Sequence, residues 1–94
     1  MSAQIAAIVA HAEVLRSDAR ALAACAERLR AIEEELKAGG GAPHWLHASV
    51  AAHLAACAAA AADLETSAQR LSRYADELRA HDRRRFSPPA GRRQ

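Results

Sequence analysis

The sequence predicts an all-α fold: an antiparallel, coiled-coil-like hairpin of two helices with a Leu/Ala seam, pairing into a four-helix bundle. Two long segments without proline or glycine flank one short stretch, residues 39–43. Each segment carries apolar residues in a heptad repeat, which is the pattern of helices that pack along one another. A connection this short makes the two helices antiparallel neighbours. Residues 1–86 of the 94 are therefore predicted to form one helical-hairpin domain.

The first helix is predicted over about residues 3–38, with Ser2 as its N-cap. Its heptads run without a break, with Leu or Ile at position d and mostly alanine at position a. Opposite charges four residues apart, such as Glu33 and Lys37, indicate a solvated flank.

The second helix is predicted over about residues 43–84. Pro43 suits its first turn, where the missing N–H costs nothing. The glycines of the loop, residues 39–43, can adopt the positive φ that ends the preceding helix. The second helix ends by Ser87, because the residue before a proline disfavours the helical conformation. Residues 87–94 are predicted to be a disordered basic tail.

One register joins the two heptad repeats. Folding the chain about the loop pairs residues whose numbers sum to about 83, so that Leu15 faces Ala68 and Leu22 faces Ala61. Layers of one large and one small side chain let two helices approach closely and interdigitate. The predicted hairpin seam comprises Ile5, Ile8, Leu15, Leu22, Leu29, Leu54, Cys57, Leu64, Leu71 and Leu78, with Ala12, Ala19, Ala26, Ala61, Ala68 and Ala75 as the small partners.

Two cysteines fall at one height in this register. Cys57 is at position d of the second helix, and Cys25 is next to Ala26, which faces it. One interpretation is a pair of small free thiols that fill a tight seam. The other is a disulfide between Cys25 and Cys57, because the height suits such a bond even though Cys25 is at the edge of the seam.

The composition limits the core that one hairpin can build. Apolar residues make up 51% of the chain but aromatic residues only 3%, and alanine supplies most of the apolar count. Each buried alanine removes little surface from water, so a lone hairpin has a thin core. We therefore expect a partner, namely another helical hairpin in a homodimer or a heterodimer.

A second set of apolar residues lies outside the seam. Alanine is the best helix former, so one interpretation is a merely exposed helix face. The other is a surface that binds a partner helix, which we favour because large apolar side chains lie there too. The predicted partner interface comprises Val9, Val14, Ile32, Trp45, Ala52, Ala56 and Ala59.

Catalytic and cofactor motifs are not found in the sequence. His44 and His47 have a spacing that can place two imidazoles on one metal, but no third ligand accompanies them, which favours ordinary polar residues at a loop end. The sequence has no nucleophile–base set and no phosphate-binding or dinucleotide-binding loop. We therefore expect that the protein is not an enzyme and that it binds no small-molecule substrate, no cofactor and no metal.

The charge of the chain is unevenly distributed along its length. The net charge is +2, but residues 82–94 hold five arginines and one aspartate, so the positive charge is concentrated at the C-terminal end. The body lacks the basicity of a nucleic-acid-binding protein, and we do not expect nucleic acid as its partner.

The start lacks the pattern of a cleaved signal peptide, and the most apolar stretch, residues 48–62, is too alanine-rich to suggest a membrane span.

The length, the two helices and a tryptophan near the turn resemble the ESX-like, Trp-x-Gly family of type VII secretion proteins, over about residues 3–82. The family's turn motif reads Trp45-Leu46-His47 in this chain. The family's export signal is a tyrosine followed four residues later by an acid. Tyr74 has Leu78 at that spacing, with the acids Asp76, Glu77 and Asp82 close by, and these acids with Tyr74 are the candidate secretion signal.

The resemblance implies pairing into a four-helix bundle and export as a folded dimer. The protein would be cytoplasmic before export and secreted without a cleaved signal peptide. Its function would be that of a small substrate, or of a co-exported or targeting partner such as an accessory hairpin that accompanies a larger secreted effector. The alternative is a cytoplasmic helical adaptor or scaffold whose basic tail binds an anion, either nucleic acid or lipid.

Overall fold

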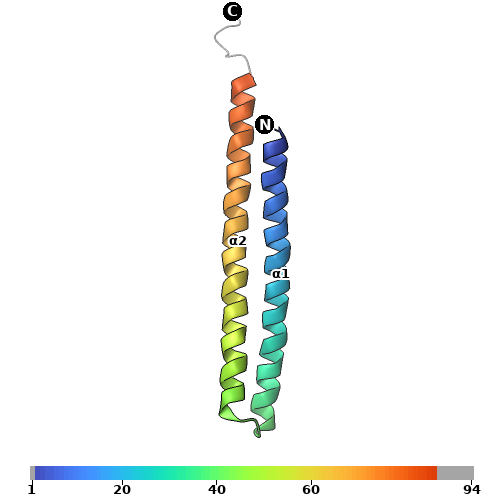
Figure 1. Cartoon of the computed structure of the whole chain (residues 1–94), viewed down its shortest axis with the longest axis vertical. Coiled ribbons are helices and arrows are strands. Elements are labelled where there is room, and N and C mark those ends of the chain that lie inside the picture. Colours follow the sequence, from blue (N-terminus) through green and yellow to red (C-terminus); the bar gives the residue numbers. More distant parts are fainter. Residues whose placement is uncertain (1, 87–94) are drawn as a thin grey trace, which may run out of the picture.

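The computed structural model describes residues 2–86, which form two helices packed side by side as an antiparallel hairpin (Figure 1). Helix α1 spans Ser2–Gly39 and helix α2 spans His44–Phe86. The described residues contain no strand, so the predicted all-α hairpin is confirmed. The helix bounds lie within one or two residues of those predicted, and the predicted tail, residues 87–94, lies outside the described residues.

The connection between the helices is built by one glycine and one proline. Gly40 has a φ of 73° and its N–H donates to the carbonyl of Leu36 at 3.3 Å, which is the left-handed ending typical of helices. Pro43 lies just before α2, and its carbonyl accepts from the N–H groups of Leu46 at 3.0 Å and of His47 at 3.4 Å. Pro43 therefore caps α2 from just outside the helix, which begins at His44, one residue after the predicted start.

The core is a narrow line of buried side chains between the helices, most of them alanines. Ala68 and Ala75 are fully buried and Ala12 is 1% exposed, whereas the leucines of the seam are half-buried. Each alanine lies on the line of closest approach, and the larger side chains cover it with their outer edges in water. The buried apolar residues are Ile5, Ala12, Ala19, Ala26, Val50, Ala68 and Ala75.

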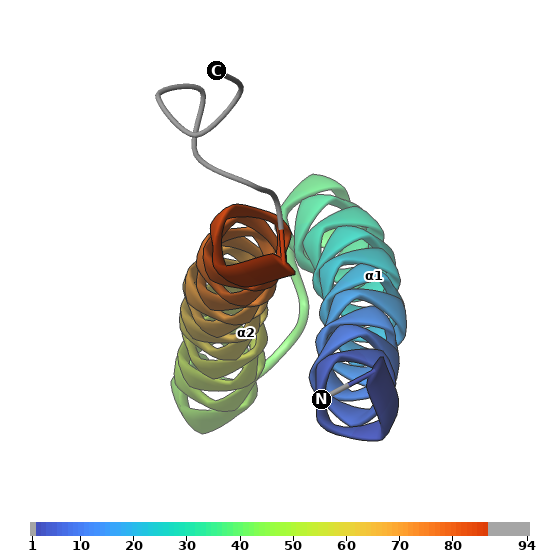
Figure 2. The ribbon, with the colours of Figure 1, turned by 90° about the horizontal axis from the view of Figure 1, so that it is seen from above.

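The hairpin is one layer of two helices. A view along its length shows α1 and α2 side by side, with no third element of the described chain over either broad face (Figure 2). Each helix therefore buries one stripe against the other and turns the rest of its surface to solvent. The pairing into a four-helix bundle expected from the sequence needs a second hairpin and stays a prediction.

Candidate partner-binding surface

The largest exposed apolar side chains lie along the outside of the hairpin. Trp45, at the start of α2, is 69% exposed, Val14 is 58% exposed and Ile32 is 45% exposed. Ala52 and Ala59 follow Trp45 at intervals of seven residues, so these three share the outer face of α2. We call this line of three residues the outer ridge. Its two alanines are exposed, as is Ala56 one turn before Ala59.

One long edge of the hairpin carries large exposed apolar side chains. Val14, Cys25 and Ile32 follow one another at intervals of eleven and seven residues, which are close to whole numbers of turns, so they lie on one side of α1. We call this edge the apolar flank. Tyr74 of α2, also exposed, belongs to the same edge, because it lies about 200° around the helix from Ser72, which is on the other edge.

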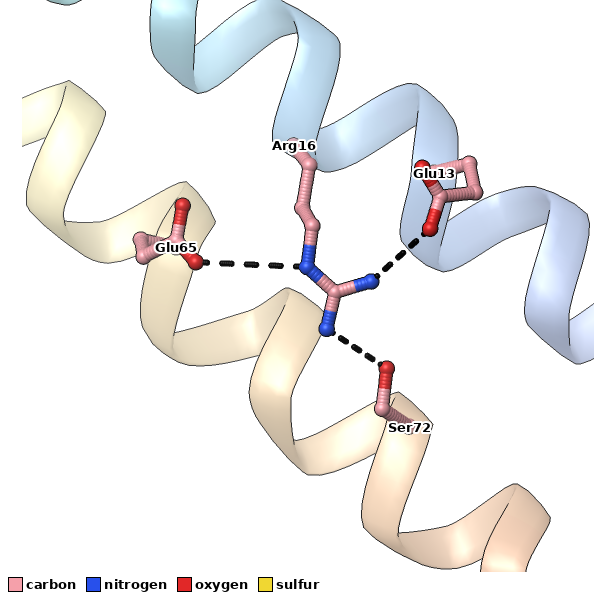
Figure 3. Close-up of polar contacts among 4 residues, drawn as sticks. All are labelled: Glu13, Arg16, Glu65 and Ser72. Atoms are coloured by element: carbon pink, nitrogen blue, oxygen red, sulfur yellow. Dashed lines mark hydrogen bonds and ion pairs between the residues drawn. The ribbon is translucent and has the colours of Figure 1, made fainter.

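The opposite edge carries a polar connection between the helices (Figure 3). The Arg16 guanidinium, on α1, donates to the Ser72 hydroxyl of α2 at 2.7 Å. Its Nε lies 4.0 Å from a Glu65 carboxylate oxygen, and a terminal nitrogen lies 3.1 Å from Glu13 on its own helix. The Arg16 side chain is only 26% exposed, so these interactions are partly shielded from water. We call the edge defined by Arg16, Glu65 and Ser72 the polar flank.

The sequence alone does not predict this connection. Arg16, Glu65 and Ser72 are ordinary flanking residues of two heptad repeats, and none belongs to a motif. A signal was nevertheless present: in the predicted register, Arg16 is within one turn of the height at which Glu65 lies on the partner helix.

The predicted interface residue Val9 lies apart from Val14 and Ile32. Val9 is seven residues before Arg16, so it shares the polar flank, where it is half-buried. With Ile5 it lines a groove at the end of the hairpin opposite the loop, and Arg79 and Asp82 line the other side. One Asp82 carboxylate oxygen is buried without a hydrogen-bond partner in the described part of the chain.

The structure does not bring the candidate secretion signal together as one cluster. Tyr74 is exposed on the apolar flank, whereas Asp82 lies in the groove at the polar flank. Asp76 pairs with Arg79 at 3.0 Å, and Glu77 is exposed. The tyrosine is thus accessible, and the acids around it have separate environments.

The two cysteines face each other across the seam. Cys57 donates its S–H to the sulfur of Cys25 at 3.9 Å, and both thiols are free and half-buried. Loss of solvation raises the pKa of Cys57, and the hydrogen bond to Cys25 and the negative charge of the Cys25 thiolate raise that pKa further. The juxtaposition predicted from the register is therefore present.

Residues near the loop form no metal site in the described chain. His44 is exposed and His47 is half-buried, and residues 2–86 contain no group of three or more His, Cys, Asp or Glu side chains that could hold a metal ion. His53, about two and a half turns into α2, instead lies with its Nδ1 2.8 Å from the carbonyl of Ser49.

The hydropathy of α2 is high for a helix on the surface. By length and composition alone, His44–Arg85 is one helix that could cross a membrane, with an 18-residue window of mean hydropathy 1.3, none of it buried. Alanine supplies much of that value, and alanine is only weakly lipophilic. This is weak support for a membrane span, and the expectation that there is none stays a prediction.

Comparisons with known proteins do not identify this hairpin: no protein-family model, no curated protein and no solved structure matches the chain.

Proposed function

We propose that this hairpin is a non-enzymatic protein-interaction module whose partner is another helical hairpin. The observation that carries the proposal is the exposure of Val14, Ile32 and Trp45 on a molecule with only one layer. Side chains of this size are poor choices for contact with water, and a partner hairpin would bury them. The homodimer and the heterodimer are both compatible with this surface.

The outer ridge suits a four-helix bundle. Trp45 supplies one large anchor, and the alanines at positions 52 and 59 let another helix approach the backbone of α2 closely. The thin core gives the same expectation from stability: five of the seven buried apolar residues are alanines, so a partner would add the burial that one hairpin lacks.

The groove at the open end offers a further contact. Its floor is apolar, with Ile5 and Val9, and the unpartnered oxygen of Asp82 can accept a hydrogen bond. A buried carboxylate oxygen without a donor is costly. A donor from the partner hairpin, placed over this groove, would remove that cost.

The biological setting that we propose is type VII secretion, in which this hairpin is a small substrate or a co-exported, targeting partner. The support is the resemblance of the sequence to the ESX-like family, together with a two-helix fold that suits it and an exposed Tyr74. The protein would be cytoplasmic before export, and a larger secreted effector is one form that the partner would take.

Sedimentation analysis and affinity capture from the native host test the interaction. Wild-type protein should associate with itself or with a second hairpin, and Trp45→Ala should weaken that association at least several-fold, since buried tryptophans dominate interfaces. Gln69→Ala, a change at an exposed polar position of α2 outside the line of the outer ridge, is the matched control. A folded monomer at every concentration, with no helical partner captured, would rule the interaction out.

Export has its own test. The protein should accumulate in the medium of the native host and remain in cells that lack the secretion ATPase, and Tyr74→Ala should also keep it inside. Equal amounts in the medium with and without the ATPase would remove the secretion role while leaving the hairpin interaction standing.

A second candidate function rests on the C-terminal end of α2. The last turn carries Arg83, Arg84 and Arg85, and α2 continues past the beginning of α1 (Figure 1). Such a basic end favours an adaptor that binds nucleic acid or anionic lipid. Binding to DNA or to phosphatidylserine vesicles that falls steeply with salt, and disappears on deletion of residues 83–94, would favour this function.

A further inference from the structure

The seam contains one pair of groups that can react with each other. Cys25 comes from α1 and Cys57 from α2, and their sulfur atoms lie 3.9 Å apart with both thiols free. The chain has two cysteines in all, so each has the other as its only thiol neighbour within the molecule.

The fold itself brings the sulfurs together. Cys57 lies in the seam, and Cys25 is next to the buried Ala26 on the edge that we call the apolar flank. Small side chains along the seam bring the two backbones close, which is what a bond between helices requires. Because both cysteines are half-buried, the pair also has access to small reagents from the apolar flank.

We propose that Cys25 and Cys57 are a redox-reactive pair that closes to an intramolecular disulfide. An S–S bond is about 2.05 Å long, so the sulfurs must still move toward each other. The two sulfurs are already in contact, with the Cys57 S–H directed at the Cys25 sulfur. Only the two cysteine side chains need to move, and they fill the seam without holding a metal or a ligand.

The oxidant is a small-molecule disulfide, and the reaction has two exchange steps. One cysteine thiolate attacks a sulfur of the oxidant, forms a mixed disulfide and releases one small thiolate. The other cysteine thiolate attacks the protein sulfur of that mixed disulfide, closes the Cys25–Cys57 bond and releases the second small thiolate. Two protein thiols are thereby oxidised, one small disulfide is reduced to two thiols, and the protons of the cysteines end on those thiols.

Ionisation of Cys57 controls part of this reaction. Only the thiolate attacks, and the raised pKa of Cys57 keeps its thiol protonated to a higher pH than usual. Closure should therefore be slow at neutral pH and faster as the pH rises.

The bond would divide the hairpin into two halves. Residues 25–57 include the loop, so closure makes a covalent ring of the loop-side half. The other half, with residues 2–24 and 58–86, keeps only noncovalent contacts such as Arg16 to Ser72. Oxidation should thus prevent the helices from separating near the loop while leaving the open end free to separate.

The redox state of the surroundings would set which form is present. Glutathione and thioredoxin keep thiols reduced in the cytosol, whereas a disulfide persists outside it. The pair would therefore be reduced in the cytosol and form the disulfide once the hairpin has reached an oxidising compartment. This inference stands on the two sulfurs alone and does not require the proposed partner or the proposed export.

Intact-mass measurement tests the bond. The full chain is held at low concentration with oxidised glutathione as the probe, then treated with iodoacetamide without reductant. The expected product is a monomer that has lost two hydrogen atoms and carries neither an alkyl group nor glutathione. A product with two alkyl groups, a lasting glutathione adduct, or a disulfide-linked dimer would each overturn the proposal.

A double variant supplies the matched control. Ala24→Cys combined with Cys25→Ser keeps two thiols in the chain but moves one to an exposed position on the outward side of α1. It should fold to the same helical content by circular dichroism and fail to form the intramolecular bond. Closure in this variant as fast as in the wild type would show that the native placement has no role.

Hydrogen exchange tests the consequence of the bond. Oxidation should raise amide protection within residues 25–57 more than in residues 2–24 and 58–86, and reductant should reverse the difference. An equal rise along both helices would overturn the division into two halves, even if the mass shows that the disulfide forms.

Discussion

The two flanks of the hairpin are made of the same two helices, yet they differ in what they can do. On the polar flank, Arg16 reaches from α1 to Ser72 and Glu65 on α2, so these three polar side chains interact within the molecule. On the apolar flank, Val14 and Ile32 are exposed. The contrast teaches that the middle of one edge connects the two helices to each other, whereas the other edge leaves large apolar side chains in water, where a partner would bury them.

The largest change in stability should come from a substitution in the line of buried alanines that lies between the two flanks. Ala68 is fully buried, and Ala68→Leu would force the helices apart and disturb both flanks at once. We expect a loss of about 1–3 kcal/mol in the free energy of unfolding, measured by urea titration. Ala62→Leu, at an exposed position of the same helix, is the control and should be nearly neutral. Equal stability of the two variants would contradict the assigned seam.

A smaller effect is expected from the polar flank. Arg16→Ala removes a charged hydrogen bond between helices, and we expect a loss of about 1 kcal/mol, given the partial exposure of the pair. Added salt should reduce the difference between variant and wild type. Arg20→Ala, at an exposed position one turn along α1, should change the stability less. If both variants lose the same amount, the polar flank does not hold the helices together.

The apolar flank should behave in the opposite way. The combined change Val14→Ser and Ile32→Ser replaces exposed side chains, so stability of the isolated hairpin should change by no more than about 0.5 kcal/mol. Self-association or partner binding, measured by sedimentation, should weaken clearly. Ala23→Ser, seven residues after Arg16 and exposed on the polar flank, is the control and should leave association unchanged. The contrast between the flanks fails if the control weakens binding as much.

The smallest effect concerns the pH dependence of the reduced protein. The pKa of Cys57 is raised above its ordinary value of 9.0 in the folded state, so the unfolded chain loses this proton at a lower pH than the hairpin does. Stability from this group is fully present below pH 9.0 and declines as the pH rises through the folded value. Unfolding of reduced wild-type protein should show this decline, and Cys57→Ser should not. A parallel pH dependence in both would refute the assignment.

The sequence could predict the hairpin because its physical requirements are periodic. Burial along one stripe demands an apolar residue every three or four positions, and a left-handed ending demands a residue such as Gly40. Both requirements produce patterns that can be recognised in a single sequence. The facing of Cys25 and Cys57 followed from the same periodicity.

The division into two flanks was harder to predict. The set chosen for the partner interface joined Val9 with Val14, which are five residues apart and therefore lie on different sides of α1. Arg16 was missed because a long side chain can point to solvent or to a neighbouring helix, and its choice depends on how far each helix is rotated. Helix rotation is a property of the packed pair and leaves no local mark in the sequence.

The line of alanines has a thermodynamic consequence. Alanine buries little apolar surface, and the heat capacity of unfolding and the sensitivity to denaturant both scale with the surface that unfolding exposes. The free hairpin should therefore have a shallow stability curve, with a broad thermal transition and a low slope in urea. For such a molecule, the concentration of a partner changes the folded population more than a modest change of temperature does, because every complex that forms withdraws only folded chains from the equilibrium.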